Sequence, residues 1–429
     1  MAPFVGCRAP PSSPCSCVRR TRSDAYVVRN LPPEVPMSNG TVLVSGAGIA
    51  GPALAYWLSR RGFTPTVVER APALRAGGNA VDFRGPTHLR VLGEMGVLDA
   101  IRQHQTHMRD LAMVDEAGRR LVTLPAAFAS GDVEIERGDL SRILHEAAKD
   151  AAEFVFGDSI ASLTDTPDGV DVTFERGRPR RFDLVVGADG LHSRVRALAF
   201  GDESRFLRFH GHYVATFAAP NHLGLDHQGL IFSEPGRAAS VASARRPEEA
   251  TALLMFASRP LDHDPRDVAQ HKAILAERFA GMGWEVPRLL EAMRQSPSLY
   301  FDAVGRIDMD RTSRGRVVLL GDAGYGGTLG GQGTGLAVVC AYVLAGELAV
   351  AKGDHRAAFQ RYEARIRRYA RRCQQGAKRV GSFFAPPTRV QLALRNAMYR
   401  ALTSRPLSRW FEKMVTSAAS DLVLPVYPA

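Results

Sequence analysis

Much of the chain alternates short apolar runs with stretches of helical periodicity. Thr41–Ser45 and Pro65–Val68 are apolar runs of strand length, and the apolar positions between Pro52 and about Arg61 repeat with the period of a helix. Further strand patterns of this kind lie at 182–187 and 317–320. Buried strands joined by helices predict the α/β class for this part of the chain, and an α+β arrangement overall.

A second pattern occupies the region between residues 205 and 257. Four segments there have strand character and are separated by turns, without a helix pattern between them. Such a series indicates an antiparallel sheet. The segments are 205–218, 229–233, 238–244 and 252–257.

These patterns divide the chain into four parts. Residues 1–38 are rich in Pro, Ser and Arg, show no periodicity, and are expected to form a disordered extension. Residues 39–205 and 300–350 are expected to form one discontinuous nucleotide-binding domain. Residues 206–299 are expected to form a substrate-binding sheet domain, and residues 351–429 a set of basic C-terminal helices.

The net charge of +11 on this 429-residue chain is concentrated near the C-terminus. Residues 351–429 hold sixteen Lys and Arg against four Asp and Glu, a net charge of +12. Arg361, Arg365, Arg368 and Arg372 fall on one face of a helix pattern, and a solvated face is the plainest interpretation. Attraction of an anionic substrate or contact with a membrane surface are the alternatives. Nucleic acid is not expected, because no recognition motif accompanies the charge.

Neither a transmembrane segment nor a disulfide framework is expected. The apolar run Leu336–Leu344 is broken soon after by Glu347 and is too short to span a bilayer. Three of the five cysteines lie in the first 38 residues, and the pair Cys15 and Cys17 has no second ligand pair with which to bind a metal. We therefore expect a cytoplasmic, metal-free monomer or homodimer.

The turn after the first strand reads Gly46-Ala-Gly-Ile-Ala-Gly51, which matches the G-x-G-x-x-G fingerprint of Rossmann-like dinucleotide-binding domains. Such glycines allow a tight turn, close approach of the backbone to a pyrophosphate, and close packing of helix on strand. Glu69 lies 23 residues after Gly46, where an acid can accept a hydrogen bond from a ribose 2′-hydroxyl. An acid there disfavours the 2′-phosphate of NADP at this site.

Two later strand patterns end in acidic turns. The run at 182–187 leads to Asp189-Gly190, and Arg196 follows in a short helix pattern from which it can reach a phosphate or Asp189. The run at 317–320 ends in Gly321-Asp322 and a glycine-rich loop that enters the helix pattern Leu336–Val350. A carboxylate suits a polyol hydroxyl, and a helix N-terminus suits an anion or an electron-rich ring. Because this loop lies some 270 residues after the fingerprint, the two suggest one long ligand held at both ends.

The order and spacing of the three motifs resemble the single-component (group A) FAD-dependent monooxygenases of the para-hydroxybenzoate hydroxylase class. The resemblance covers about residues 40–350, and the short helical C-terminus is similar to that of the tetracycline-inactivating flavin monooxygenases. It implies FAD as the cofactor and NADPH or NADH as a transient electron donor. The positions that it implies for binding FAD are Gly46, Gly48, Ile49, Ala50, Gly51, Glu69, Arg70, Asp82, Arg137, Asp189, Gly321, Asp322, Gly331, Gln332, Gly333, Thr334 and Gly335.

The resemblance also implies particular roles for some of these residues. Asp322 is expected to bind the ribitol hydroxyls, and the amides from Gly331 to Gly335 to lie near flavin N1 and O2, where negative charge gathers on reduction. Arg137 is expected to contact the flavin chain. The segment that contains Asp82 is expected to line the isoalloxazine ring.

The implied activity uses O2 to hydroxylate an aromatic or polyketide-like small molecule through a C4a-hydroperoxyflavin. No catalytic side chain is assigned, because the cofactor supplies the chemistry. The alternatives are a Baeyer–Villiger oxygenase on the same fold and, from a different class, a non-catalytic flavin-binding protein. The expected substrate contacts are Arg84, His212, Phe217, Phe232, Met255 and Tyr325.

One stretch departs from the family's pattern. The family usually has Ala-Ala or Ala-His after the Gly-Asp pair and a proline a few residues later, whereas this chain reads Ala323-Gly-Tyr-Gly-Gly-Thr-Leu329. How this loop is held is therefore open. Tyr325 is the residue expected to fill the space.

Overall fold

The computed structural model describes residues 40–75, 77–125, 128, 130–243, 245–329, 332–375, 377–404, 406–408 and 422–428. The expected extension at residues 1–38 lies outside the described residues, and so does Gly331. The chain divides into Met1–Pro36 and Met37–Ala429, and every element named below belongs to the second of these units. The α/β class is confirmed, with one largely parallel sheet and one largely antiparallel sheet.

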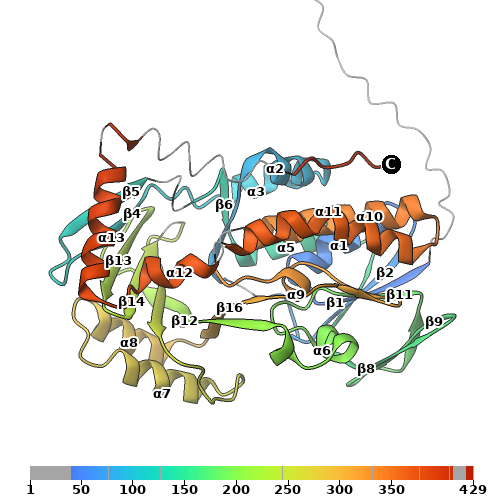
Figure 1. The fold of residues 1–429 in the computed structure, drawn as a ribbon, viewed down its shortest axis with the longest axis horizontal. Helices are drawn as coiled ribbons and strands as arrows, with labels where there is room; N and C mark the ends of the chain where they lie inside the picture. The colour runs from blue at the N-terminus through green and yellow to red at the C-terminus, as the bar shows by residue number, and fades with distance from the viewer. Residues whose placement is uncertain are drawn as a thin grey trace, which may run out of the picture. The chain divides into compact units, whose positions relative to one another are not determined.

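A six-stranded sheet carries all three motifs at the ends of its strands (Figure 1). β1 (Thr41–Ser45) pairs in parallel with β2 (Thr64–Glu69) and with β11 (Leu184–Gly187), and β11 pairs in parallel with β18 (Val317–Leu319). The carboxyl ends of parallel strands lie at one edge of a sheet, so the fingerprint, the Asp-Gly turn and the Gly-Asp loop start from the same edge. β7 (Glu153–Phe156) and β17 (Ser313–Arg314) complete the order β17-β18-β11-β1-β2-β7.

Helix α10 (Gly333–Ala351) is the core helix of this part of the fold. It packs against α1 (Ala50–Ser59) and α11 (His355–Gln375), and its side chains are buried on every side from Gly335 to Leu348. This burial explains why its sequence is apolar all round. The helix is longer than the apolar run Leu336–Leu344, and its length and composition would suffice to cross a membrane. However, 78% of that apolar window is buried inside the protein, as in the core helix of a globular domain.

The second sheet has seven strands in the order β16-β12-β15-β14-β13-β4-β5. Its neighbouring strands are antiparallel except β13 and β4, which pair in parallel. Four of the strands coincide with the four segments expected from the sequence, whereas the other three were not expected. The bounds are β4 (Asp110–Val114), β5 (Arg120–Pro125), β12 (Leu207–Pro220), β13 (Gln228–Glu234), β14 (Arg237–Ser243), β15 (Glu249–Ala257) and β16 (Tyr300–Ile307).

Different helices cover the two faces of this second sheet (Figure 1). One face packs on α7 (Val268–Arg278) and α8 (Val286–Gln295) in a large apolar cluster. The opposite face packs on α12 (Ala377–Phe384) and α13 (Arg389–Leu402). Leu329, in the glycine-rich loop before α10, also packs on this opposite face, which we call the loop-side face.

Shorter elements connect the two sheets and extend the first. β3 (Ala80–Phe83) and β6 (Val133–Glu136) pair as a two-stranded antiparallel ribbon. In the sequence both strands lie between β2 and β7, which belong to the first sheet. The remaining elements are α2 (Gly85–Glu94), α3 (Leu98–Gln103), α5 (Arg137–Ala148), β8 (Ile160–Thr166), β9 (Gly169–Phe174), β10 (Arg180–Phe182), α6 (Arg194–Phe200), the 3-10 turn Glu203–Arg205 and α9 (Asp322–Tyr325).

The expected solvated arginine face of the C-terminal helices is only partly solvated. Arg361 and Arg365 on α11 each donate to a different carboxylate oxygen of Glu347 on α10, with N–O distances of 2.6 Å. Glu347 is almost fully buried. Its two carboxylate oxygens accept hydrogen bonds from these arginines and from the hydroxyl of Tyr427, which offset the cost of burying the charge. Helical spacing therefore identified the face but not its partner, since Glu347 lies in another helix. Arg368 and Arg372 are exposed as expected.

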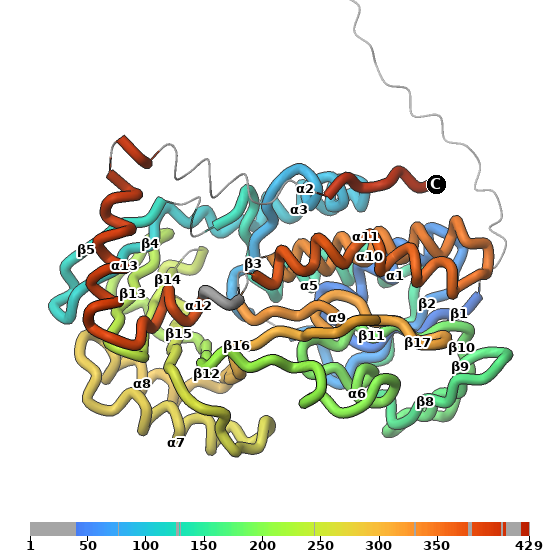
Figure 2. The backbone as a smooth tube through the Cα atoms, in the orientation of Figure 1, coloured from blue at the N-terminus to red at the C-terminus, as the bar shows by residue number. Residues whose placement is uncertain are grey.

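The C-terminal segment 422–428 returns to the first sheet and its helices after α13 (Figure 2). Its carbonyl groups accept hydrogen bonds from Thr87 and Arg90 of α2 and from Tyr342 of α10. The ring of Tyr427 lies over Gly346, where a Cβ atom would come within 2.2 Å of it. The segment thus connects α2 to α10.

Candidate functional site

The two glycine-rich motifs, some 270 residues apart in sequence, are in contact. Gly321 adopts a φ of 59° at the end of β18, and a Cβ atom there would lie 3.4 Å from Cβ of Ala50 and 3.2 Å from Cβ of Ala337. The Gly-Asp turn is therefore inserted between the first turns of α1 and α10. This contact supports the interpretation that both motifs hold one ligand.

The three fingerprint glycines differ in what surrounds them. A Cβ atom at Gly46 would lie 2.6 Å from the carbonyl oxygen of Ala188, and one at Gly51 would lie 1.9 Å from the carbonyl oxygen of Gly46. At Gly48 a Cβ atom would meet no protein atom within 4 Å. Gly46 and Gly51 are thus required by the fold, whereas Gly48 leaves open space at the start of α1, beside Ile49 and Ala50. A cradle of this kind fits a pyrophosphate.

Gly48→Ala is expected to leave the fold intact and to weaken dinucleotide binding by at least about tenfold, because the added methyl group occupies only ligand space. FAD titration of the apoprotein and thermal melting of the same sample measure the two effects separately. Gly46→Ala is the matched control and is expected to lower the melting temperature, since its φ of 104° and its close contact oppose any side chain. Wild-type FAD affinity in Gly48→Ala would contradict this assignment.

Glu69 ends β2 beside the fingerprint. Its two carboxylate oxygens accept hydrogen bonds of 2.8 Å from the backbone N–H groups of Ala47 and Ala71. These bonds fix the carboxylate at the turn and leave lone pairs for a ribose hydroxyl. Arg70, the next residue, is exposed.

Asp322 begins α9 at the contact between the two motifs. Burial raises the pKa of its carboxyl group, and the positive charge of Arg137 acts in the opposite direction. Among the described residues, none donates a hydrogen bond to this carboxylate. A desolvated carboxylate without a protein donor fits a ligand that brings its own hydroxyl groups. Arg137 lies at the start of α5, and its backbone N–H donates to the carbonyl oxygen of Asn79 near the β3–β6 ribbon.

The N-terminus of α10 faces the same region. A Cβ atom on Gly333 would lie 3.4 Å from Oδ1 of Asp322, so the carboxylate and the first amides of the helix are neighbours. Gln332 is the N-cap residue, and Thr334 is partly buried in the first turn. At Gly335 a Cβ atom would lie 2.1 Å from the ring of His88. A negative charge or electron-rich edge placed here would be stabilised by the helix dipole.

A buried chain of hydrogen bonds supports this helix start. The backbone N–H of Arg84 donates to Nδ1 of His88, so Nε2 carries the proton and bonds the hydroxyl of Tyr369. Tyr369 in turn bonds Cys373, and the thiol of Cys373 donates to Oε1 of Gln332 at 3.3 Å. Burial lowers the pKa of His88 to about 4, so the imidazole is neutral. No local pattern in the sequence predicts this chain of hydrogen bonds, because its members lie on α2, α11 and the loop before α10.

Tyr325 occupies the space under the loop that lacks the family's proline. Its ring is buried beside Tyr362 of α11, and its hydroxyl bonds Thr312 at 3.0 Å. It fills space in the core, as expected. This position gives no support to the expected contact with substrate.

The Asp-Gly turn is organised by its own side chains. Asp189 accepts hydrogen bonds from the hydroxyls of Ser45 and Ser193 and from the backbone N–H of Val195, and burial raises the pKa of its carboxyl group. Arg196 is fully buried and donates to the carbonyl oxygens of Leu191 and Ala323 and to Glu203. Arg196 therefore joins the Asp-Gly turn to the residue after Asp322.

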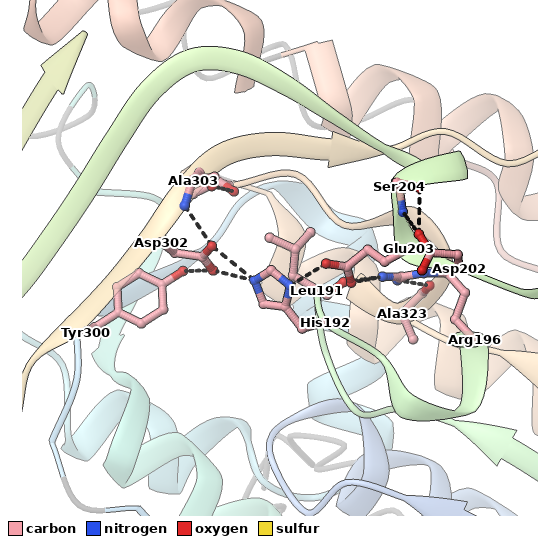
Figure 3. A network of polar contacts seen from close by, with 11 residues as sticks. Leu191, His192, Arg196, Asp202, Glu203, Ser204, Tyr300, Asp302, Ala303 and Ala323 are labelled. Carbon is pink, nitrogen blue, oxygen red and sulfur yellow. Dashed lines mark hydrogen bonds and ion pairs between the residues drawn. The ribbon is translucent and has the colours of Figure 1, made fainter. Parts of the chain in front are cut away.

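His192 extends this network to the second sheet (Figure 3). Its Nδ1 bonds Glu203 at 2.8 Å, and its Nε2 bonds Asp302 of β16 at 3.0 Å. Hydrogen bonds that its ring N–H groups donate to the carboxylates of Asp302 and Glu203 raise its pKa from 6.5 to about 10. The same Asp302 accepts a hydrogen bond from the hydroxyl of Tyr300, which lies within electrostatic reach of Arg137 and Asp322.

The protonated form of His192 is expected to stabilise the fold in a pH-dependent way. Because its pKa is raised from 6.5 to about 10 in the folded state, this stabilisation is complete below pH 6.5 and is lost as the pH rises to about 10. Melting temperatures of the wild type and of His192→Gln should therefore differ at pH 6 and converge near pH 10. A constant difference across this range would show that the ion pairs with Asp302 and Glu203 are not its cause.

The β3–β6 ribbon places three titratable side chains together. Asp82 and Glu134 are register partners, and Arg84 forms an ion pair with Asp82. Burial raises the pKa of Glu134 to about 7, opposed by a hydrogen bond from Thr106, and burial also raises the pKa of Asp82. Arg84 is thus held by Asp82 at the start of α2.

The expected substrate residues of the second sheet fall on opposite faces. Met255 lies on the loop-side face in a cluster with Leu329, and the ring of His212 lies against Gly381 of α12 on that face. Phe217 and Phe232 belong to the cluster on α7 and α8, on the opposite face. Side chains alternate along a strand, so residues 212 and 217 of β12 cannot share a face. Phe217 and Phe232 therefore pack in the core beside α7 and α8, whereas Tyr300 and Asp302 of β16 pair with Thr216 and Val214 and face the loop side.

Within the described part of the chain, no group of three or more His, Cys, Asp or Glu side chains could hold a metal ion. The residues that are brought together instead suit an extended ligand with a diphosphate, a polyol and a ring. The fingerprint suits the diphosphate, Asp322 the polyol, and the α10 N-terminus the ring.

Comparison with known proteins identifies a ligand of this kind. Residues 39–380 match the family described as the FAD binding domain. A flavin-dependent monooxygenase of Legionella longbeachae serogroup 1 (strain NSW150) is 38% identical over 395 residues, which span 91% of this chain and 98% of that protein. An uncharacterised protein of Mycobacterium tuberculosis (strain ATCC 25618 / H37Rv) is 46% identical over 341 residues, which span 78% of this chain and 91% of the relative.

A solved structure extends the likeness to the whole fold. The crystal structure of tetracycline destructase Tet(55) aligns with a TM-score of 0.77 and 38% sequence identity, covering 90% of this chain and 98% of that one.

Proposed function

Since the chain belongs to the FAD-binding-domain family of flavin-dependent monooxygenases, we propose that it transfers one oxygen atom from O2 to an aromatic or polyketide-like small molecule, with NADPH or NADH as the electron donor. FAD is its cofactor. The substrate class, the nicotinamide donor and the hydroxylation outcome are the proposed parts.

The observation that carries this proposal is the contact between the glycine-rich loop and the second sheet. Leu329 of that loop packs against Val214, Met255 and Val304 on the loop-side face. A ring held at the N-terminus of α10 would therefore lie close to this face of the second sheet, where we propose that the substrate binds. Binding proteins need no such second surface, whereas an oxygen transfer between cofactor and substrate does.

The residues of the chain divide the work of such a reaction. Bound FAD supplies the redox chemistry and the activation of O2. The first amides of α10 stabilise negative charge at the ring, and Asp322 with Arg137 orients the polyol chain. Helix α12 covers the loop-side face through Val380 and Phe384 and excludes water from it.

The relatives support a polycyclic substrate. Tet(55), at 38% identity, is named as a tetracycline destructase. A tetracycline is a polyketide with enol and ketone groups, so it is the first candidate to test.

The experiment mixes purified FAD-loaded protein with NADPH or NADH and follows flavin absorbance and O2 uptake, with and without tetracycline. We expect nicotinamide oxidation that is accelerated by substrate and a product heavier by one oxygen atom. NMR of the product separates ring hydroxylation from insertion into a carbon–carbon bond. Flavin that neither nicotinamide reduces, with a panel of aromatic and polyketide compounds present, would refute the proposal.

A further inference from the structure

Helix α13 presents an apolar stripe to solvent. Val390, Leu394 and Met398 are exposed by 77%, 67% and 47%, and they follow one another at four-residue intervals on this helix. Residues spaced by four lie on one side of a helix, so the three side chains form a continuous surface. Ala397 and Ala401, also exposed, lie beside them.

The orientation of α13 is fixed by its other side. Arg395 is buried, and its guanidinium donates to the hydroxyl of Ser233 and to the carbonyl oxygens of Phe383 and Phe384. Tyr399 packs on Phe383 in a small cluster under the helix. A rotation that buried the stripe would withdraw the charged Arg395 from its acceptors, so the exposure of the stripe is built into the packing.

The charged residues of α13 itself are all arginines. From Ala377 to Phe411 the chain contains seven Lys and Arg and no Asp or Glu. Arg389 and Arg400 are exposed near the two ends of α13. This run accounts for much of the C-terminal charge that the flavin site does not use.

We propose that the exposed face of α13 docks on an anionic lipid surface. An interfacial helix has an apolar stripe that enters the lipid boundary and cationic side chains that contact phosphate groups, and α13 has both. A second copy is disfavoured as the occupant, since antiparallel packing of two stripes would place Arg389 beside the partner's Arg400. The proposal is independent of the reaction assigned to the flavin site.

The location of α13 gives such docking a consequence. α13 and α12 cover the loop-side face, on which substrate is expected to lie. A lipid surface at α13 would therefore be adjacent to the substrate region, which suits the capture of an apolar substrate from a membrane.

The test is sedimentation of the full-length holoprotein with vesicles. We expect binding to vesicles of phosphatidylcholine mixed with phosphatidylglycerol, weak binding to pure phosphatidylcholine, and a decrease as salt is raised. Val390→Gln, Leu394→Gln and Met398→Gln combined should lower the partition coefficient at least about tenfold, and Arg389→Gln with Arg400→Gln should remove most of the salt dependence. Val268→Gln with Val350→Gln alters exposed apolar residues on α7 and α10 and should bind as the wild type does.

FAD content and melting temperature serve as folding controls, and Leu394→Gln alone replaces the triple variant if the latter misfolds. The proposal is overturned if the wild type fails to bind the anionic vesicles, or if the stripe variant binds them unchanged. It is also overturned if the wild type is a dimer by analytical ultracentrifugation that the stripe variant converts to a monomer, because the stripe is then a contact between copies.

Discussion

Asp322→Ala is expected to weaken FAD binding about 100-fold, because a charge-assisted hydrogen bond to a ligand hydroxyl contributes about 1.5–3 kcal/mol. The same change should leave the melting temperature of the apoprotein unchanged or slightly higher. The reason is that the carboxylate is desolvated and has no hydrogen-bond donor among the described residues. Fluorescence titration of apoprotein with FAD gives the first quantity, and thermal melting of apoprotein gives the second.

The sign of the stability effect follows from the direction of the pKa shift. Burial raises the pKa of Asp322 in the folded state, so the ionised carboxylate opposes folding above that pKa and no longer does so at acid pH. Arg137 reduces this cost without removing it. The increase in apoprotein melting temperature caused by Asp322→Ala should therefore become smaller as the pH falls.

Asp310→Ala is the matched control, since Asp310 is exposed in the same part of the chain. It should change neither FAD affinity nor melting temperature. Unchanged FAD affinity in Asp322→Ala would show that the carboxylate does not contact the cofactor. A large fall in apoprotein stability would instead assign Asp322 a structural role.

The sequence predicted the parts of this site that depend on local pattern. Strand, turn and helix at 41–61 follow from glycine positions and apolar runs, and all were found within a residue or two of the expected bounds. The sequence also suggested that the two glycine-rich motifs hold one ligand, but the direct contact between Gly321 and Ala50 is a finding of the structure.

The sequence did not predict which partners a polar side chain finds across the fold. Arg361 and Arg365 were expected in solvent, but they hold a glutamate of another helix. His88 was not singled out, because a lone histidine on an apolar helix gives no local signal of the chain that links it to Gln332. These pairings depend on how α10, α11 and α2 pack, which residue spacing within one helix does not specify.

The expected substrate contacts on the second sheet are constrained by the alternation of side chains along a strand. His212 and Phe217 lie five residues apart on β12, and an odd spacing places two residues of a strand on opposite faces. Phe217 and Phe232 pack in the apolar cluster beside α7 and α8. Tyr300 and Asp302 share the loop-side face, because they pair with Thr216 and Val214 of β12, but the sequence did not predict the strand β16 that carries them.

Arg196→Met is expected to have the largest effect on stability, lowering the free energy of unfolding by about 3–5 kcal/mol. Arg196 is fully buried and donates to Leu191, Ala323 and Glu203. Its removal leaves two carbonyl oxygens without their donor and takes away one of the two cations that pair with Glu203, the other being His192. Urea denaturation of the FAD-loaded protein measures the loss.

Arg194→Met on the same helix is the matched control. Arg194 is exposed and makes only longer bonds, of 3.4 and 3.3 Å, to the carbonyl oxygens of Ile160 and Ala161, so its loss should cost less than about 1 kcal/mol. A double-mutant cycle with His192→Gln should show coupling on the order of 1 kcal/mol between Arg196 and His192, since both bind Glu203. Additive effects would mean that the Asp-Gly turn and β16 are held independently. Coupling would instead show that Glu203 links the Asp-Gly turn, and through Arg196 the residue after Asp322, to β16 of the second sheet.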